Sequence, residues 1–317
     1  MTGSRPPQQQ PNDLQAPPAP PASAARRLRA ALAAPRLARA MGAHSPLSAR
    51  LAEEAGFDVV WSSGLEISAA AGVPDANILA MGECLDAAAD LAAAVDIPVL
   101  ADCDSGFGNV NNVIHMVRSY EARGVAGVCI EDKQFPKLNS FVEGNQDLAP
   151  LDDFAAKIRA AAETRTDMVV VARLEALISG QGMAEALRRA EVYERAGADA
   201  LLIHSKRKDP EEVFAFRESY RGDLPVIVVP TTYNQVTVEE LEQRGFAMAI
   251  YANQALRSSI RAMRETLTRI MRDGTTLNVE PELAPLKEVF DLQRMPQMLA
   301  QQERYESLGR ELAEAAQ

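Results

Sequence analysis

A regular alternation of short apolar runs and helical stretches constrains the fold of this chain more than any other feature. Each apolar run has the length of a buried parallel strand, and each is followed by a segment with helical periodicity. The predicted strands are Leu37–Met41, Phe57–Trp61, Val99–Ala101, Gly127–Ile130, Met168–Ala172, Ala200–Ile203, Pro225–Val229 and Ala247–Tyr251. The predicted helices are 47–54, 81–94, 110–123, 151–164, 183–195, 210–220, 238–244 and 254–272. Eight strand–helix units predict an α/β fold, a TIM-type (β/α)8 barrel, with a doubly wound open sheet as the alternative.

The two ends of the chain differ from this repeating part. Residues 1–25 are rich in Pro, Gln and Ala and have too little apolar surface to offset the entropy of ordering, so they are predicted to be a disordered tail. Residues 26–317 are predicted to form a single catalytic domain, with a lead-in helix at Ala24–Ala34. Helical periodicity over Leu286–Leu308 exceeds what one barrel needs, so C-terminal helices are predicted to pack on the barrel or on a partner subunit.

Composition excludes several classes of function. The net charge of −11 argues against nucleic acid and anionic membrane as partners. No apolar run approaches the roughly 20 residues of a membrane span. The three cysteines lie far apart, without the spacing of a disulfide framework or a zinc finger, which indicates a reducing compartment and a cytoplasmic protein.

Acidic side chains follow two adjacent predicted strands. Asp102 and Asp104 come at the end of the third strand, and Glu131 ends the fourth. Residues two apart in a strand face the same side, so the two aspartates are expected to point together into the barrel mouth. Carboxylates in such a cluster repel one another unless a cation neutralises them, and oxygen ligands favour Mg²⁺, with Mn²⁺ as the alternative. Asp75, in a Gly/Pro-containing segment, indicates by itself a turn or a helix cap.

Cationic and polar groups follow the neighbouring strands. Arg173 ends a run of apolar residues, where a guanidinium would be desolvated unless an anion met it. His204 ends the sixth strand in the same way, and Asn139 lies in the loop after the fourth. Together these three side chains suit a phosphate or carboxylate group, so a small, multiply charged anion is the expected substrate. Trp61 is expected either in the core or in the pocket wall.

Several motifs resemble the phosphoenolpyruvate mutase/isocitrate lyase superfamily, and within it the phosphoenolpyruvate mutase family. The matching segments are Gly42–His44, Leu47–Arg50, Trp61–Leu65, Asp102–Asn109, Glu131–Ser140, Ala172–Ala176 and His204–Lys206. They span about residues 36–310 of the chain. The segment Lys137-Leu138-Asn139-Ser140 is the part most specific for the mutases.

The resemblance implies a barrel whose last helix is exchanged between subunits, in a homotetramer built as a dimer of dimers. It implies direct binding of Mg²⁺ by Asp102, with Asp75, Asp104 and Glu131 acting mostly through metal-bound water. Lys137 would lie on a gating loop that closes over the substrate.

The resemblance also implies how the substrate is held. The substrate carboxylate would be bound by backbone N–H groups of Ser63, Gly64 and Leu65. The phosphoryl group would be held by Arg173, His204 and Asn139, the last of which also lies on the gating loop.

The implied activity is that of an isomerase interconverting phosphoenolpyruvate and 3-phosphonopyruvate, the C–P bond-forming step of phosphonate biosynthesis. Asp75 is the candidate nucleophile if a phosphoaspartate forms, whereas a dissociative path needs none. One alternative is phosphonopyruvate hydrolase, which typically has Thr where Asn139 stands. A second is a C–C lyase of the superfamily, whose Lys-Lys-Cys-Gly-His segment is absent from Lys133–Lys137. A third is a barrel that binds phosphorylated acids without turnover.

Overall fold

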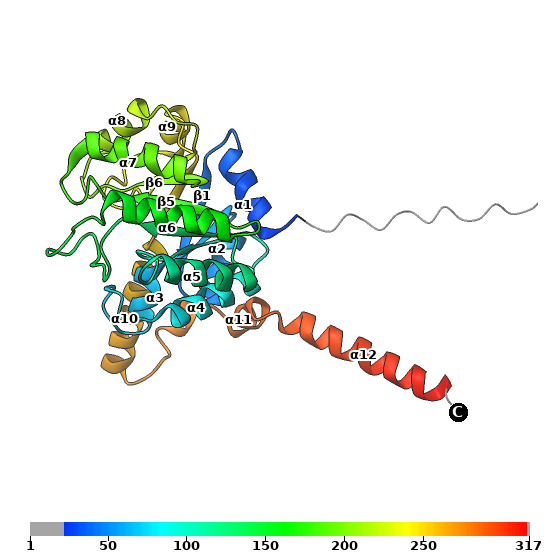
Figure 1. Ribbon diagram of the computed structural model, residues 1–317. Helices are drawn as coiled ribbons and strands as arrows, with labels where there is room; N and C mark the ends of the chain where they lie inside the picture. Colours follow the sequence, from blue (N-terminus) through cyan, green and yellow to red (C-terminus); the bar gives the residue numbers. More distant parts are fainter. Residues whose placement is uncertain (1–21, 316–317) are drawn as a thin grey trace, which may run out of the picture.

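A closed barrel of eight parallel strands forms the centre of the molecule (Figure 1). The computed structural model describes residues 22–315. Strand order follows chain order, and the last strand pairs with the first. The strands are β1 Ala38–Ala43, β2 Val59–Ser62, β3 Val99–Asp102, β4 Gly127–Glu131, β5 Val169–Leu174, β6 Ala200–Ile203, β7 Val226–Val228 and β8 Met248–Tyr251. The predicted (β/α)8 barrel is confirmed, and the open-sheet alternative is wrong.

Helices surround the barrel and follow each strand in turn (Figure 1). They are α1 Ala24–Ala33, α2 Pro46–Glu54, α3 Gly64–Ala70, α4 Met81–Ala94, α5 Val110–Ala122, α6 Leu151–Thr164, α7 Gly182–Ala196, α8 Glu211–Ser219, α9 Val238–Gln243, α10 Gln254–Asp273, α11 Leu286–Leu292 and α12 Met295–Ala315, with a 3₁₀ turn at Glu280–Glu282. All eight predicted barrel helices are present. The short helix α3 was not predicted.

Helix α1 closes the N-terminal end of the barrel. Leu28 and Leu32 of this helix are buried in the same cluster as Leu100 and Cys129 from the strands. Gly127 permits this approach, because a Cβ there would lie 2.8 Å from a methyl group of Leu28. With one end of the barrel closed by apolar packing, the carboxyl ends of the strands are left to carry polar groups.

At the two ends of the chain the structure differs in part from the predictions. Helix α1 begins at Ala24 and is capped by the Ser23 hydroxyl, so it starts inside the predicted tail of residues 1–25; the rest of that predicted tail, residues 1–21, lies outside the described residues. The predicted C-terminal helical segment is present as α11 and α12, and α12 extends away from the barrel (Figure 1). The apolar side chains of α11 are not buried against this barrel, since Leu286 is 72% exposed and Phe290 is 46% exposed.

Two further observations concern the cysteines and the long helices. Cys84, Cys103 and Cys129 are buried and free, as expected for small core residues without disulfides. Within residues 22–315, no helix combines the length and the apolar character needed to cross a membrane.

Candidate active site

A small pocket opens at the carboxyl ends of the strands, where the polar residues were predicted to gather. It encloses about 50 Å³. The lining residues come from most of the strands and from the loop after β4; they are Trp61, Ser63, Leu65, Asp75, Asp102, Glu131, Lys137, Asn139, Ser140, Phe141, Arg173, His204, Val229, Thr231, Ala252 and Asn253. All the predicted site residues except Gly64 and Asp104 line this pocket, and those two lie directly beside it. Trp61 serves both of its expected roles, since it also belongs to the barrel core.

The loop between β4 and α6, residues 132–149, forms a lid over the pocket. At its base the lid is held by an antiparallel bridge between Lys133 and Leu148, and the Ala149 N–H donates to the Asp132 carbonyl at 2.9 Å. At its tip the lid contacts the turn that carries Asp75. This closed arrangement brings Lys137 and Asn139 from the lid into the pocket, where the resemblance placed them.

Asp75 lies in a turn, as its neighbours predict, but its carboxylate is a pocket group. Oδ1 accepts a hydrogen bond from Lys137 Nζ at 2.6 Å, and Oδ2 accepts one from Asn139 Nδ2 at 2.6 Å. Burial would raise the pKa of Asp75, but Lys137 and Asn139 outweigh burial and hold the pKa below its usual value. Asp75 is therefore ionised at neutral pH and fastens the tip of the lid.

The Lys137 ammonium also neutralises the predicted acidic cluster. Its Nζ lies 2.9 Å from Asp104 Oδ1 as well as 2.6 Å from Asp75 Oδ1. Burial opposes the charge on Lys137, but the carboxylates around it raise its pKa above the usual value. Burial raises the pKa of Asp104 to about 7, with Lys137 opposing this shift and Asp102 adding to it. The cluster is short of positive charge even with the lid closed.

Asp104 does not lie on a strand, contrary to the prediction. Strand β3 ends at Asp102, and Asp104 has a φ of 48°, in the left-handed region. Its carboxylate is held instead by the Asn77 amide, at 2.7 Å, and by the ion pair with Lys137. The two aspartates still converge, because the backbone N–H of Asp104 donates to Asp102 Oδ1 at 3.3 Å.

Arg173 and His204 form the cationic side of the pocket, and Glu175 holds them together. Arg173 Nε donates to Glu175 Oε1 at 2.5 Å, and its Nη2 lies 2.7 Å from His204 Nδ1. His204 Nδ1 also lies 2.8 Å from Glu175 Oε1. This nitrogen faces a donor and an acceptor, so it can bond to only one of them at a time. The anion that Arg173 was expected to need is supplied within the protein by Glu175.

This arrangement sets the charge states of Glu175, His204 and Arg173. Burial would raise the pKa of Glu175, but Arg173 and His204 hold the pKa well below its usual value. Burial lowers the pKa of His204, and Glu175 offsets this only in part, so the ring is neutral at neutral pH. Arg173 is thus the permanent positive charge of this wall, and it lies 3.5 Å from Glu131 Oε2 on the next strand.

The segment Ser63–Leu65 lies at the start of α3. The Ser63 hydroxyl caps this helix by accepting the Glu66 N–H at 3.3 Å, and Ser63 and Leu65 line the pocket. The first N–H groups of a helix have no partner inside it, which suits an oxyanion. Gly64 must remain small, because a Cβ would lie 3.3 Å from Asp102 Oδ2.

The acidic residues fit a hydrated divalent cation better than a cage of direct ligands. Within residues 22–315, no three His, Cys, Asp or Glu side chains are spaced to hold a metal ion directly. Two carboxylate oxygens of this cluster, Glu131 Oε1 and Asp104 Oδ1, are buried without a hydrogen-bond partner in the described part of the chain, although the latter has its ion pair with Lys137. Unpaired carboxylate oxygens beside Asp102 suit a hard cation that retains several waters.

Sequence reasoning missed the residues that complete the pocket. Glu175 and Ser140 stood in the matching motifs without a role, and Phe141 stands next to them on the lid. Thr231 and Asn253 follow β7 and β8, so the strand-end rule that placed Arg173 at the barrel mouth places them there too, but it indicates no role for either. The Thr231 hydroxyl is buried without a hydrogen-bond partner.

Comparisons with known proteins agree with this geometry. The family model for phosphoenolpyruvate phosphomutase matches residues 28–271. A phosphoenolpyruvate phosphomutase of Tetrahymena pyriformis is 48% identical over 256 residues, which cover 80% of this chain and 85% of that protein.

Two solved structures have the same fold. That of a phosphoenolpyruvate phosphomutase from Streptomyces platensis subsp. rosaceus has a TM-score of 0.87 and 52% identity, and the match covers 89% of this chain and 99% of that one. A phosphonopyruvate hydrolase in complex with oxalate and Mg²⁺ has a TM-score of 0.85 and 45% identity, with 90% and 99% covered. The chain belongs to the phosphoenolpyruvate phosphomutase family.

Proposed function

We propose that this protein interconverts phosphoenolpyruvate and 3-phosphonopyruvate. The bond between phosphorus and the enol oxygen breaks, and the same phosphoryl group is captured by C3 of the pyruvate enolate, so no atom is gained or lost. The observation that carries the proposal is the closed lid, in which Lys137 and Asn139 both bond to Asp75 over a pocket of about 50 Å³. A phosphoryl group in transit must be kept from water, and a lid fastened at its tip does this.

The two charged groups of the substrate would be held by opposite sides of the pocket. The N–H groups of Ser63–Leu65 would hold the carboxylate, which stays in place throughout. Arg173, His204 and Asn139 would hold the phosphoryl group, whose charge is spread over its oxygens in a loose transition state. Asp75 has two roles open to it: it fastens the lid in either case, and it is the nucleophile if the phosphoryl group is passed through a covalent intermediate.

We further propose Mg²⁺, with Mn²⁺ as the substitute, as the cofactor. Asp102 would bind it directly, and Asp75, Asp104 and Glu131 would hold its waters. When bound, the cation supplies positive charge for the enolate oxygen. The unpaired oxygens of Glu131 and Asp104 support this assignment, as does the complex of the related hydrolase with oxalate and Mg²⁺.

The alternative is hydrolysis of phosphonopyruvate to pyruvate and phosphate, which the similarity to a hydrolase favours. Phosphorus NMR of the purified protein with phosphonopyruvate and Mg²⁺, without a coupling enzyme, separates the two. The phosphoenolpyruvate resonance is expected to grow. Accumulation of inorganic phosphate alone would overturn the mutase proposal. Asn139→Thr is the matched variant, and it is expected to increase the share of phosphate among the products.

We also propose that the protein is a homotetramer, built as a dimer of dimers, in which the last helix of the barrel is exchanged between subunits. Helices α10, α11 and α12 contain no buried residue in the single chain. A groove of about 320 Å³ lies between α2 and α10, lined by apolar residues such as Leu47, Leu51 and Phe57. An apolar helix of a second subunit would cover such surfaces.

A further inference from the structure

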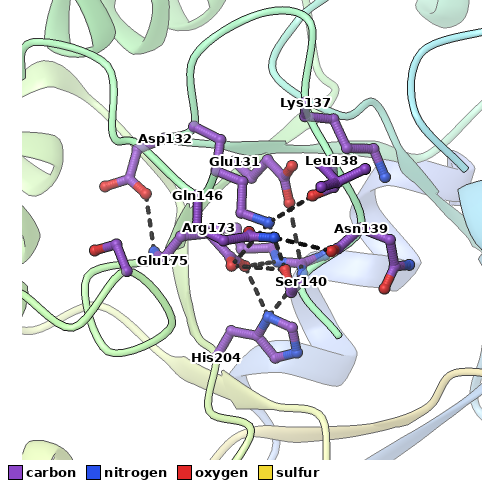
Figure 2. Close-up of polar contacts among 12 residues, drawn as sticks. Glu131, Asp132, Lys137, Leu138, Asn139, Ser140, Gln146, Arg173, Glu175 and His204 are labelled. Carbon is purple, nitrogen blue, oxygen red and sulfur yellow. Dashed lines mark hydrogen bonds and ion pairs between the residues drawn. The ribbon is translucent and has the colours of Figure 1, made fainter. Parts of the chain in front are cut away.

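Glu175 faces the anion-binding wall with one carboxylate oxygen and the lid with the other. Oε1 contacts Arg173 Nε at 2.5 Å and His204 Nδ1 at 2.8 Å. Oε2 accepts a hydrogen bond from the Ser140 hydroxyl at 2.9 Å and lies 3.5 Å from Lys133 Nζ. Figure 2 shows Arg173, His204 and Ser140 converging on the Glu175 carboxylate. The Glu175 carboxylate, a rigid planar group, therefore bonds both to the lid and to the proposed anion-binding pair.

On the lid, the Glu175 contact involves two parts of the loop, one at Lys133 and one at Ser140. The Ser140 oxygen also accepts a hydrogen bond from Lys133 Nζ at 2.6 Å, and the same ammonium donates to the Leu138 carbonyl at 3.0 Å. Lys133 begins the lid and Ser140 lies beyond its tip. Both side chains are buried, so the hydrogen bonds between them are shielded from water.

The barrel side of the contact is fixed. The Glu175 N–H donates to Asp132 Oδ1 at 2.8 Å, and Asp132 Oδ2 accepts from the Tyr193 hydroxyl at 2.8 Å and from Arg189 Nη1 at 3.1 Å. These partners on α7 and at the end of β4 hold the backbone of Glu175 in place. In an open lid, Ser140 would no longer hold Oε2, and the Glu175 carboxylate would be restrained through Oε1 by Arg173 and His204.

Rotation of this carboxylate would disturb the anion-binding pair. Because both oxygens belong to one plane, a bond that fixes Oε2 also fixes the direction in which Oε1 meets Arg173 and His204. A second lid contact reinforces this link, since the Phe141 ring packs edge-on against His204 with centroids 5.7 Å apart. The orientation of the binding pair and the closure of the lid are thereby linked.

We propose that Glu175 is a positioning residue that couples lid closure to anion binding through Ser140 and Lys133. A bound anion that fixes Arg173 and His204 favours the Glu175 orientation that Ser140 recognises, and a closed lid favours the orientation that binds the anion. Such coupling is reciprocal. The inference rests on the proposed function only in taking Arg173 and His204 as the anion-binding pair.

The test is Ser140→Ala, which removes the lid's hydrogen bond to Glu175 without changing the Glu175, Arg173 or His204 side chains. Glu143→Ala, at an exposed lid position, is the matched control. Hydrogen exchange of residues 132–149 is measured with Mg²⁺, without ligand and at saturating phosphonopyruvate, together with the affinity for phosphonopyruvate. A hydrogen bond to a charged group contributes enough to shift the closing equilibrium about tenfold or more.

Ser140→Ala is expected to bind phosphonopyruvate about tenfold more weakly and, at saturation, to leave the lid about tenfold less protected than in the wild type or Glu143→Ala. Ser140→Thr, which keeps the hydroxyl, is expected to regain much of both. Full ligand-induced protection with unchanged affinity in Ser140→Ala would overturn the coupling. If the wild type shows no response to phosphonopyruvate, the proposed function fails. The inference then fails as well only if the ligand-free lid exchanges equally in the wild type, Ser140→Ala and Glu143→Ala.

Discussion

Lys137→Met tests whether the lid lysine stabilises the acidic cluster in the absence of metal. Methionine keeps the length and apolar stem of the side chain but removes the charge that lies 2.6 Å from Asp75 and 2.9 Å from Asp104. Breaking a buried ion pair by removing one partner costs about 3–5 kcal/mol. The loss here is expected near the lower limit, about 3 kcal/mol, because Asp104 can take up a proton and the lid can open.

That loss of stability should appear as a shift in the thermal midpoint of unfolding. For a domain of this size, each kcal/mol changes the thermal midpoint by about 2–4 °C, so the midpoint of Lys137→Met should fall by roughly 6–12 °C in EDTA. Calorimetry at pH 8 limits this proton uptake, because the pKa of Asp104 in the wild type is about 7. Added Mg²⁺ should then raise the midpoint of Lys137→Met more than that of the wild type, because the cation replaces the missing ammonium.

Asp102→Asn is the control, because it removes the direct ligand proposed for Mg²⁺. The double variant Lys137→Met/Asp102→Asn should lose most of the gain from Mg²⁺. The reasoning would be refuted if Lys137→Met had the wild-type midpoint in EDTA, since Lys137 would then contribute nothing to the cluster.

Two further predictions concern the pocket and the subunit contacts. Thr231→Val removes a buried hydroxyl that has no hydrogen-bond partner among residues 22–315, so stability should be unchanged or slightly higher. If the hydroxyl binds substrate, kcat/KM should fall about tenfold, and steady-state kinetics with unchanged kcat/KM would show that it does not. Met271 on α10 is 83% exposed in the single chain, so Met271→Glu should be harmless in a monomer. Light scattering should instead show a wild-type mass four times that of one chain and dissociation of the variant, and a monomeric wild type would contradict the tetramer.

The barrel was predictable because parallel strands buried on both faces leave continuous apolar runs, and each run here is separated from the next by a helical stretch. The strand-end rule then placed Asp102, Glu131, Arg173 and His204 together, since the carboxyl ends of all strands meet at one face of a barrel. These predictions depend only on the order of apolar runs and helical stretches along the chain, and that order can be read directly from the sequence.

The rest of the site depends on contacts between distant segments. Asp104 was placed by strand periodicity, but the strand ends two residues earlier and the left-handed backbone turns its carboxylate toward Asn77. The bonds of Glu175 to Ser140 and His204 join β5 to the lid and to β6, and no spacing in the sequence indicates them. Helix α3 is only seven residues long, so its periodicity is too brief to detect.

Closure of the barrel has a consequence for how the chain folds. β1 can complete its pairing only with β8, and their partners Ala38 and Met248 lie about 210 residues apart in the chain. Joining ends at that separation costs about 5 kcal/mol of loop entropy by the logarithmic rule. At roughly 5–20 residues per second, β1 waits about 10–40 s on the ribosome for its partner. During that interval one edge of the growing sheet is open to any other extended chain, so the nascent protein is most vulnerable to aggregation just before its last strand emerges.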